Sequence, residues 1–173
     1  MERTLLLLRH GKSDWGVDTL DDYDRPLRTR GREATQRMAT WLRNHAYTTP
    51  HIVSSSAVRA RSTAELIARE LGLACTTVEL DGRLYEATPK TLLEVCRQRQ
   101  SHTRLLMLVG HNPGLEMLCE HLSAQPLAPA SNGKLLPTAA LAVLPLRHGW
   151  AHLDSGASEG AYIVRPRELP DSK

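Results

Sequence analysis

Two short, wholly apolar runs constrain the fold of this chain more than any other feature. They span residues 5–8 and 105–109, and each is too short for a buried helix but typical of a strand buried on both faces of a sheet. Both runs end abruptly in polar residues. Arg9 and His10 follow the first run, and His111 follows the second after one glycine. The sequence therefore predicts two histidines at the ends of two buried strands.

Helical and strand-like segments alternate along the rest of the chain. Apolar residues recur at helical spacing, and capping residues support this, over residues 31–45, 57–71, 88–98 and 113–122. Further strands are expected at residues 51–54, 75–78, 139–146 and 150–153. We expect Thr88 and Asn112 to be the N-caps of the two later helices. This alternation predicts a three-layer α/β/α fold with a mostly parallel central sheet and an antiparallel edge.

Length and composition restrict the class of protein. A chain of 173 residues with 41% hydrophobic residues is expected to form one domain over residues 1–173, with a loose tail over about 160–173. The net charge of +3, without a dense basic stripe, argues against nucleic-acid binding. No apolar stretch is long enough for a membrane span or a signal peptide. The three cysteines are widely spaced, which fits a reducing cytoplasm, the compartment we expect.

Cationic and imidazole side chains occur at three strand-to-helix junctions. Arg9 and His10 lie at the first junction, and Arg59 lies in the first helical turn after the serines at 54–56. His111 lies at the third junction. Because the carboxyl ends of parallel strands meet at one edge of a sheet, these side chains are expected to converge on one pocket. A histidine at a strand end is more often structural when taken alone, so the prediction depends on the joint placement.

Such a pocket suits a phosphoryl group. Guanidinium groups match phosphate oxygens and stay charged, and helix N-termini at the second and third junctions add amide donors. A neutral imidazole can attack phosphorus, and a second histidine can donate a hydrogen bond as charge builds on the oxygens. We expect neither a metal ion nor a cofactor, because no carboxylate cluster that could hold Mg²⁺ lies at these junctions.

At these residues the chain resembles the histidine phosphatase superfamily, which includes phosphoglycerate mutases and acid phosphatases. Three motifs carry the resemblance: Arg9-His10-Gly11, Arg59-Ala60 with Thr63-Ala64, and Gly110-His111. The segments Arg25-Pro26-Leu27, Arg30-Gly31 and 110–116 look like those of SixA-type phosphohistidine phosphatases. The likeness extends over roughly residues 4–146 and implies a phosphoglycerate mutase-like fold.

The resemblance also implies roles for individual residues. His10 would be the nucleophile, while Arg9, Arg59 and His111 would bind phosphate and stabilise the transition state. Arg25 would close the pocket from the loop after the first strand, and Asn112 is a further candidate for substrate binding. Many mutases carry Glu and Asn shortly after Arg-His-Gly, whereas this chain has Lys12 and Gly16. Mutase activity is therefore not expected.

The proton donor is a separate question, because cleaving an alkyl phosphate ester benefits from a general acid. Larger members of the superfamily supply a carboxylate from a mid-chain loop, and Glu86 falls at about that place. Glu86 can equally be a surface glutamate. A phosphohistidine substrate relaxes the requirement, because a protonated imidazole is already a good leaving group.

Three functions are compatible with these residues. The first is dephosphorylation of a protein phosphohistidine, for example on a histidine-containing phosphotransfer domain, through phospho-His10. The second is hydrolysis of a small metabolite or a phospho-Ser/Thr monoester. The third is a non-enzymatic module that binds phosphorylated partners, which the retention of both histidines and both arginines disfavours.

Overall fold

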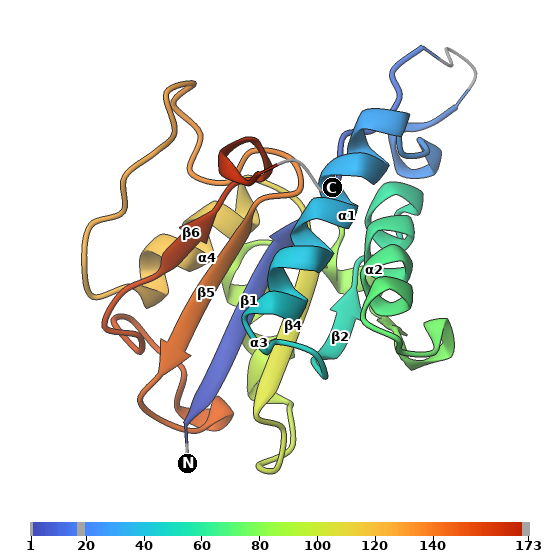
Figure 1. The fold of residues 1–173 in the computed structure, drawn as a ribbon. Helices are drawn as coiled ribbons and strands as arrows, with labels where there is room; N and C mark the ends of the chain where they lie inside the picture. Colours follow the sequence, from blue (N-terminus) through green and yellow to red (C-terminus); the bar gives the residue numbers. More distant parts are fainter. Residues whose placement is uncertain (1, 17–19, 171–173) are drawn as a thin grey trace.

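A six-stranded mixed sheet organises the chain in the computed structural model, which describes residues 2–16 and 20–170 (Figure 1). The strands are β1 (Arg3–Arg9), β2 (His51–Ser54), β3 (Glu79–Leu80), β4 (Leu105–Gly110), β5 (Leu141–Leu146) and β6 (Tyr162–Val164). Their order is β3-β2-β4-β1-β5-β6. The first four strands of this order are parallel, and β5 and β6 form an antiparallel edge. The predicted fold class is confirmed.

Helices cover both faces of the sheet. In Figure 1, α1 and α2 lie over one face, and α3 and α4 lie behind it. Their bounds are α1 (Thr29–Asn44), α2 (Val58–Glu70), α3 (Pro89–Arg97) and α4 (Gly114–Leu122). Single 3-10 turns are η1 (Asp22–Asp24), η2 (Cys75–Thr77), η3 (Gly82–Leu84), η4 (Trp150–His152) and η5 (Pro166–Glu168). None of the helices within the described ranges is long and apolar enough to cross a lipid bilayer.

The alternation of side chains along β1 explains its continuous apolar run. Leu5 and Leu7 pack into the core under α3 and α4, whereas Leu6 and Leu8 pack into the core under α1 and α2. All four side chains are fully buried. Successive residues of a strand point to opposite faces, so a strand covered on both faces needs an apolar residue at every position. Burial of a leucine contributes about 1.5–3 kcal/mol, which makes this strand a stable platform.

The register between β1 and β4 sets the position of the two histidines. Arg9 pairs with Gly110 at the ends of these parallel neighbours. The backbone N–H of His10 then donates to the carbonyl of Gly110 at 3.1 Å. His10 and His111 therefore leave adjacent strands at the same level of the sheet.

Close backbone contact fixes the segment that follows His10. A Cβ at Gly11 would lie 2.7 Å from the carbonyl oxygen of Gly31, and one at Gly31 would lie 2.2 Å from that of Lys12. Only glycines allow α1 to lie this close to the chain after β1. The N-terminus of α1 is thereby held beside the end of the central strand.

Two of the expected strands are wrong. Residues 75–78 form η2 and its end, and the adjoining strand is the two-residue β3 that follows. Residues 150–153 form η4, which buries Trp150 and directs its Nε1 to the carbonyl of Thr103 at 2.8 Å. The buried indole of Trp150 holds this segment against the core, so the segment does not need to pair with a strand of the sheet. The antiparallel partner of β5 is β6 instead.

The C-terminal segment is more ordered than expected. The stretch predicted to be loose contains β6 and η5, and its Pro166 is buried. The guanidinium of Arg165 donates to the carbonyls of Leu135 at 3.3 Å and Ala128 at 2.8 Å. These bonds tie the segment to the loop before β5. Residues 171–173 lie outside the described ranges.

The loop after β1, from which Arg25 was expected to reach the pocket, contains the single turn η1. An isolated bridge between Ser13 and Leu27 closes its base. Residues 17–19 of this segment, including Asp18, lie outside the described ranges.

Candidate active site

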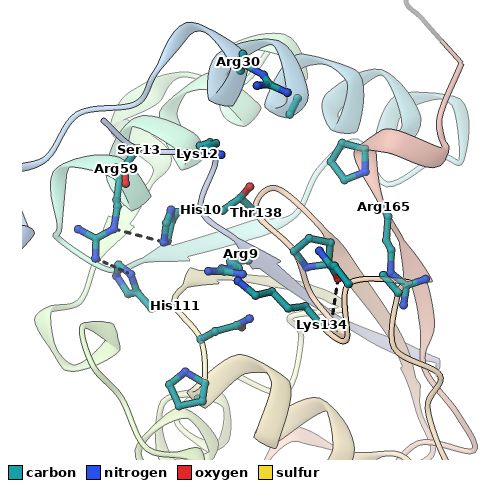
Figure 2. Close-up of a pocket in the computed structure, with 18 of the residues that line it drawn as sticks. Arg9, His10, Lys12, Ser13, Arg30, Arg59, His111, Lys134, Thr138 and Arg165 are labelled. Atoms are coloured by element: carbon teal, nitrogen blue, oxygen red, sulfur yellow. Dashed lines mark hydrogen bonds between the residues drawn. The ribbon is translucent and has the colours of Figure 1, made fainter. Parts of the chain in front are cut away.

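The structure brings together the four side chains expected to converge. The ring centroids of His10 and His111 are 5.1 Å apart, and Arg59 lies against both rings (Figure 2). Arg59 Nε is 3.3 Å from His10 Nε2, and its Nη2 is 3.4 Å from His111 Nδ1. Arg9 lines the same pocket. His10, Arg59 and His111 are buried, and Arg9 is half-buried. The pocket therefore concentrates two imidazoles and two guanidinium groups in a place that is largely shielded from bulk water.

The first two sequence motifs contact each other directly. The backbone N–H of Gly11 donates to Thr63 Oγ1 at 3.0 Å. The Thr63 hydroxyl in turn donates to the carbonyl of Arg59 at 2.7 Å, one turn earlier in α2. Thr63 therefore positions the first turn of α2, and with it Arg59, relative to the end of β1.

Hydrogen bonds define the tautomer of His10. Its Nδ1 lies 2.7 Å from the carbonyl oxygen of Gly11, which can only accept a hydrogen bond. Nδ1 must therefore carry the proton, which leaves the lone pair on Nε2. The contact with Arg59 agrees, because a guanidinium can only donate. Nε2 is the nitrogen of His10 that can act as a nucleophile.

The same reasoning applies to His111. Its Nδ1 faces the Arg59 donor, so it holds the lone pair, and its Nε2 lies 2.8 Å from Ser55 Oγ. Nε2–H therefore donates to the serine hydroxyl. Ser55 is buried and follows β2, so it fixes the orientation of the second ring from a third strand end. The serines at 54–56 belong to the second strand-to-helix junction of the predicted site. The hydrogen bond between Ser55 and His111 was not predicted.

Both imidazoles are neutral at physiological pH. Burial lowers the pKa of His10 to about 3, and the charges of Arg59 and Arg9 act in the same direction, although the bond to Gly11 opposes them. Burial likewise lowers the pKa of His111 to about 4, assisted by the charge of Arg59. The lone pair on His10 is thus available over the whole physiological range.

Arg9 and Asn112 fix the loop that precedes β5. Arg9 Nη1 and Asn112 Nδ2 each donate to the carbonyl of Leu136 at 2.9 Å. The N–H of Leu136 donates to Glu116 Oε1 at 2.8 Å. The expectation that Asn112 caps a helix is wrong, because its amide is used for Leu136 and α4 has Pro113 as its N-cap. Asn112 still lines the pocket.

Asp22 is a site residue that the sequence did not reveal. Its carboxylate accepts from Arg59 Nη2 at 2.8 Å, from Arg25 Nε at 3.1 Å and from the Tyr85 hydroxyl at 2.8 Å. Partial burial alone would raise the pKa of Asp22, but the hydrogen bonds from Tyr85, Arg25 and Arg59 hold that pKa well below its usual range. An ionised carboxylate therefore lies beside the cations that are candidates for phosphate binding.

Arg25 lines the pocket, but the hydrogen bonds that its guanidinium makes are local. It donates to Asp22 and, through Nη1, to Ser13 Oγ at 2.9 Å. Its guanidinium also lies 3.5 Å from the centroid of the Trp15 ring. Arg25 thus holds Asp22 and the loop in place, and it adds positive charge near His111.

Glu86 lies at the mouth of the same pocket. It is exposed, follows η3 and has a positive φ of 50°. The preceding residue, Tyr85, packs its ring edge-on against His111 at a centroid distance of 5.4 Å. The loop that carries Glu86 is therefore in contact with His111, and Glu86 itself is exposed to solvent.

The pocket is large, with a volume of about 1190 Å³. It extends from the two histidines past α1, the loop before β5 and η5. Within residues 2–16 and 20–170, no three His, Cys, Asp or Glu side chains are grouped so that they could hold a metal ion.

Comparison with known proteins now identifies the family. A family model described as the histidine phosphatase superfamily (branch 1) matches residues 5–90. An uncharacterized protein of Mycobacterium tuberculosis is 30% identical over 159 residues, which cover 87% of this chain and 94% of the relative. The chain belongs to the histidine phosphatase superfamily.

Solved structures agree with this assignment of the fold. A candidate phosphohistidine phosphatase SixA from Nakamurella multipartitia superposes with a TM-score of 0.77 at 24% identity, covering 96% of this chain and 97% of the other. The protein histidine phosphatase SixA complexed with tungstate superposes with a TM-score of 0.71 at 21% identity, covering 96% and 99% of the two chains. The chain therefore shares the fold of these SixA structures over nearly its full length.

Proposed function

We propose that this histidine phosphatase hydrolyses protein phosphohistidine through a covalent phosphoryl-His10 intermediate. The observation that carries the proposal is the state of His10. Its ring is neutral, its Nδ1 proton is held by the Gly11 carbonyl, and its Nε2 lone pair accepts from Arg59 in a pocket that Arg9 and His111 also line. These are the requirements for an imidazole nucleophile beside groups that bind phosphoryl oxygens.

The reaction proceeds in two steps. The Nε2 lone pair of His10 attacks phosphorus, the bond from phosphorus to the substrate imidazole breaks, and its electron pair leaves with that imidazole. Water then attacks phospho-His10, which releases inorganic phosphate and returns the neutral ring. Arg9 and Arg59 bind the phosphoryl oxygens in both steps, and neither step requires a metal ion.

His111 assists once the phosphoryl group is bound. In the structure the Nδ1 of His111 carries a lone pair that accepts from Arg59. A bound dianion favours the protonated ring and so raises its pKa. Nδ1–H then donates to a phosphoryl oxygen, while Ser55 continues to hold the ring through Nε2.

The leaving group favours phosphohistidine over an alkyl ester. A protonated imidazole departs readily, whereas an alkoxide needs a general acid. Asp22 is ionised and therefore cannot supply that proton at neutral pH. Glu86, which is exposed at the pocket mouth beside Tyr85, is our candidate for that acid among the glutamates that line the pocket. The wide pocket also suits a protein surface better than a small ester.

Turnover in purified protein tests this function. The parent protein is expected to hydrolyse both a phosphohistidine peptide and an aryl phosphate in the presence of EDTA, and vanadate is expected to inhibit it. His10→Asn is expected to abolish both activities. Absence of turnover in the parent protein would favour the phosphate-binding module, and strict dependence on an added divalent ion would contradict the metal-free mechanism.

Glu86→Gln separates phosphohistidine from ester substrates. If the substrate is a phosphohistidine, the variant retains kcat on the phosphohistidine peptide, because the leaving imidazole needs no donor. A loss of at least tenfold on an alkyl phosphate alone identifies Glu86 as the acid for ester cleavage. If the parent hydrolyses the alkyl ester faster than the peptide, the alternative of a small-metabolite or phospho-Ser/Thr phosphatase is correct.

A further inference from the structure

Positive charge is concentrated around the pocket well beyond the two histidines. Among the residues that the structure describes, nine Lys and Arg residues line this pocket, but only four Asp and Glu residues do so. The net charge of the whole chain is only +3, so the rest of the surface carries no comparable excess. The reaction centre itself uses Arg9, Arg25 and Arg59. The other cations need a separate explanation.

Four of these cations have no role in holding the fold. Lys12, Arg30, Lys134 and Arg167 are exposed, and none of their side chains makes a hydrogen bond or ion pair with any other residue among those described. Arg165 differs, because its guanidinium is bonded to backbone carbonyls. Figure 2 shows Lys12, Arg30 and Lys134 among the side chains that line the pocket around His10. We call the four residues the basic rim.

The basic rim is assembled from four separate segments. Lys12 follows β1, Arg30 lies in the first turn of α1, Lys134 lies in the loop before β5, and Arg167 lies in η5. Such a distribution surrounds the pocket instead of forming one compact site. A second phosphate of a small molecule is typically bound by a few converging groups in a pocket of about 300–1,000 Å³. The observed 1190 Å³ and the solvation of every rim residue fit a broader partner.

We propose that the basic rim docks acidic side chains of the protein substrate that flank its phosphohistidine. This inference rests on the proposed function and names the kind of partner surface that the site accepts. Opposite charges attract over about 10 Å at 0.1 M salt, so the rim raises the rate of productive encounter. It does not touch the reacting atoms, so it acts on kcat/KM and leaves kcat unchanged.

Two phosphohistidine peptides that differ only in flanking Glu or Gln residues test the proposal. The parent protein is expected to hydrolyse the Glu peptide with a kcat/KM about tenfold higher at low salt, with the difference shrinking as salt is added. The double variant Lys12→Gln/Lys134→Gln is expected to lose most of this preference. Its kcat/KM on the Gln peptide and on an aryl phosphate should fall by a smaller factor than on the Glu peptide, because only the phosphoryl dianion is then attracted by the rim.

The matched control is Arg32→Gln/Lys90→Gln, which removes the same charge from exposed positions outside the pocket lining. This control is expected to keep the full preference for the Glu peptide. Equal losses in the two double variants, or a loss in Lys12→Gln/Lys134→Gln that is the same for both peptides, would overturn the proposal. So would a parent protein that shows no preference at low salt.

Inhibition by an unphosphorylated peptide tests the docking surface independently of phosphoryl transfer. The Glu peptide without its phosphoryl group should inhibit turnover of the aryl phosphate by the parent and the control, but inhibit the Lys12→Gln/Lys134→Gln variant much less. If neither phosphorylated peptide is hydrolysed while this inhibition is seen, the proposed substrate is wrong and the docking surface stands. If a small bisphosphate, and not the Glu peptide, loses kcat/KM in the variant, the rim serves a small polyanion and the proposal fails.

Discussion

Asp22 introduces a negative charge directly beside Arg25 and Arg59, next to the two histidines. Its carboxylate accepts hydrogen bonds from Arg25 and Arg59, and its backbone carbonyl accepts a further hydrogen bond from Arg59. A phosphoryl dianion needs the same Arg59 donors. Asp22 and the substrate must therefore compete for one guanidinium, while Asp22 also holds that guanidinium at the pocket.

Asp22→Asn is expected to strengthen binding of free oxyanions. Removal of the charge reduces repulsion and releases donors of Arg59, so the inhibition constants of phosphate and vanadate should fall about three- to tenfold. Inhibition of aryl phosphate turnover measures this directly. Asp21→Asn, at a neighbouring exposed position outside the pocket lining, is the control. Weaker inhibition in Asp22→Asn would mean that Asp22 serves chiefly to position Arg59.

Sequence reasoning at this scale placed His10, His111 and Arg59 together but missed Asp22. The histidines follow apolar strands, so topology alone brings them to one edge. Asp22 is one of several acids in a polar loop, and its partners lie three residues away at Arg25, 37 residues away at Arg59 and 63 residues away at Tyr85. No local spacing distinguishes it from Asp21 or from the other loop acids.

At the scale of elements, the site depends on how closely α1 approaches the end of β1. Gly31 in the first turn of α1 lies against the backbone of Lys12. The residue after His10, Gly11, faces the same turn. Any displacement of α1 is therefore transmitted to the segment that carries His10.

Gly31→Ala is expected to destabilise the fold and impair the site together. Its Cβ would lie 2.2 Å from the Lys12 carbonyl oxygen, and because backbone must move to relieve this contact, the free energy of unfolding should fall by about 1–3 kcal/mol. Urea unfolding measures the loss. Gly149→Ala is the control, because a Cβ there comes no closer than 3.9 Å to Arg3. Equal stability of the two variants would show that α1 shifts without cost.

The apolar pattern of a segment decided whether its secondary structure was predicted correctly from the sequence. The strands around 5–8 and 105–109 were found because their runs are wholly apolar, and the four helices because their apolar residues recur at helical spacing. The segments at 75–78 and 150–153 were assigned wrongly to strands, because four residues containing Thr and Val or Trp do not distinguish a strand from a 3-10 turn. The strand β6 was missed because only three residues of a polar segment pair with β5.

At the scale of the whole molecule, the two buried histidines couple stability to pH. Both pKa values are lower in the folded protein, about 3 for His10 and about 4 for His111, than the ordinary 6.5. Below pH 6.5 the unfolded chain therefore binds protons that the folded protein does not. The stability present above pH 6.5 is lost progressively as the pH falls toward these folded values.

The free energy of unfolding is expected to fall by roughly 2–4 kcal/mol between pH 7 and pH 5 from these two groups. Urea unfolding at both pH values measures this difference. In the double variant His10→Asn/His111→Asn the decrease should be smaller by about that amount, since neither side chain titrates. An identical decrease in the parent and the variant would show that the rings are not held neutral by burial.

The location of the phosphoryl group during turnover shows whether His10 is the nucleophile. The protein is mixed rapidly with a radioactively labelled phosphohistidine peptide, quenched in alkaline detergent and mapped by mass spectrometry. We expect a transient phosphoryl group on the proteolytic peptide that contains His10. In the His10→Asn variant, the corresponding peptide is expected to carry no phosphoryl group. A label on any other residue, or undiminished turnover by His10→Asn, would contradict it.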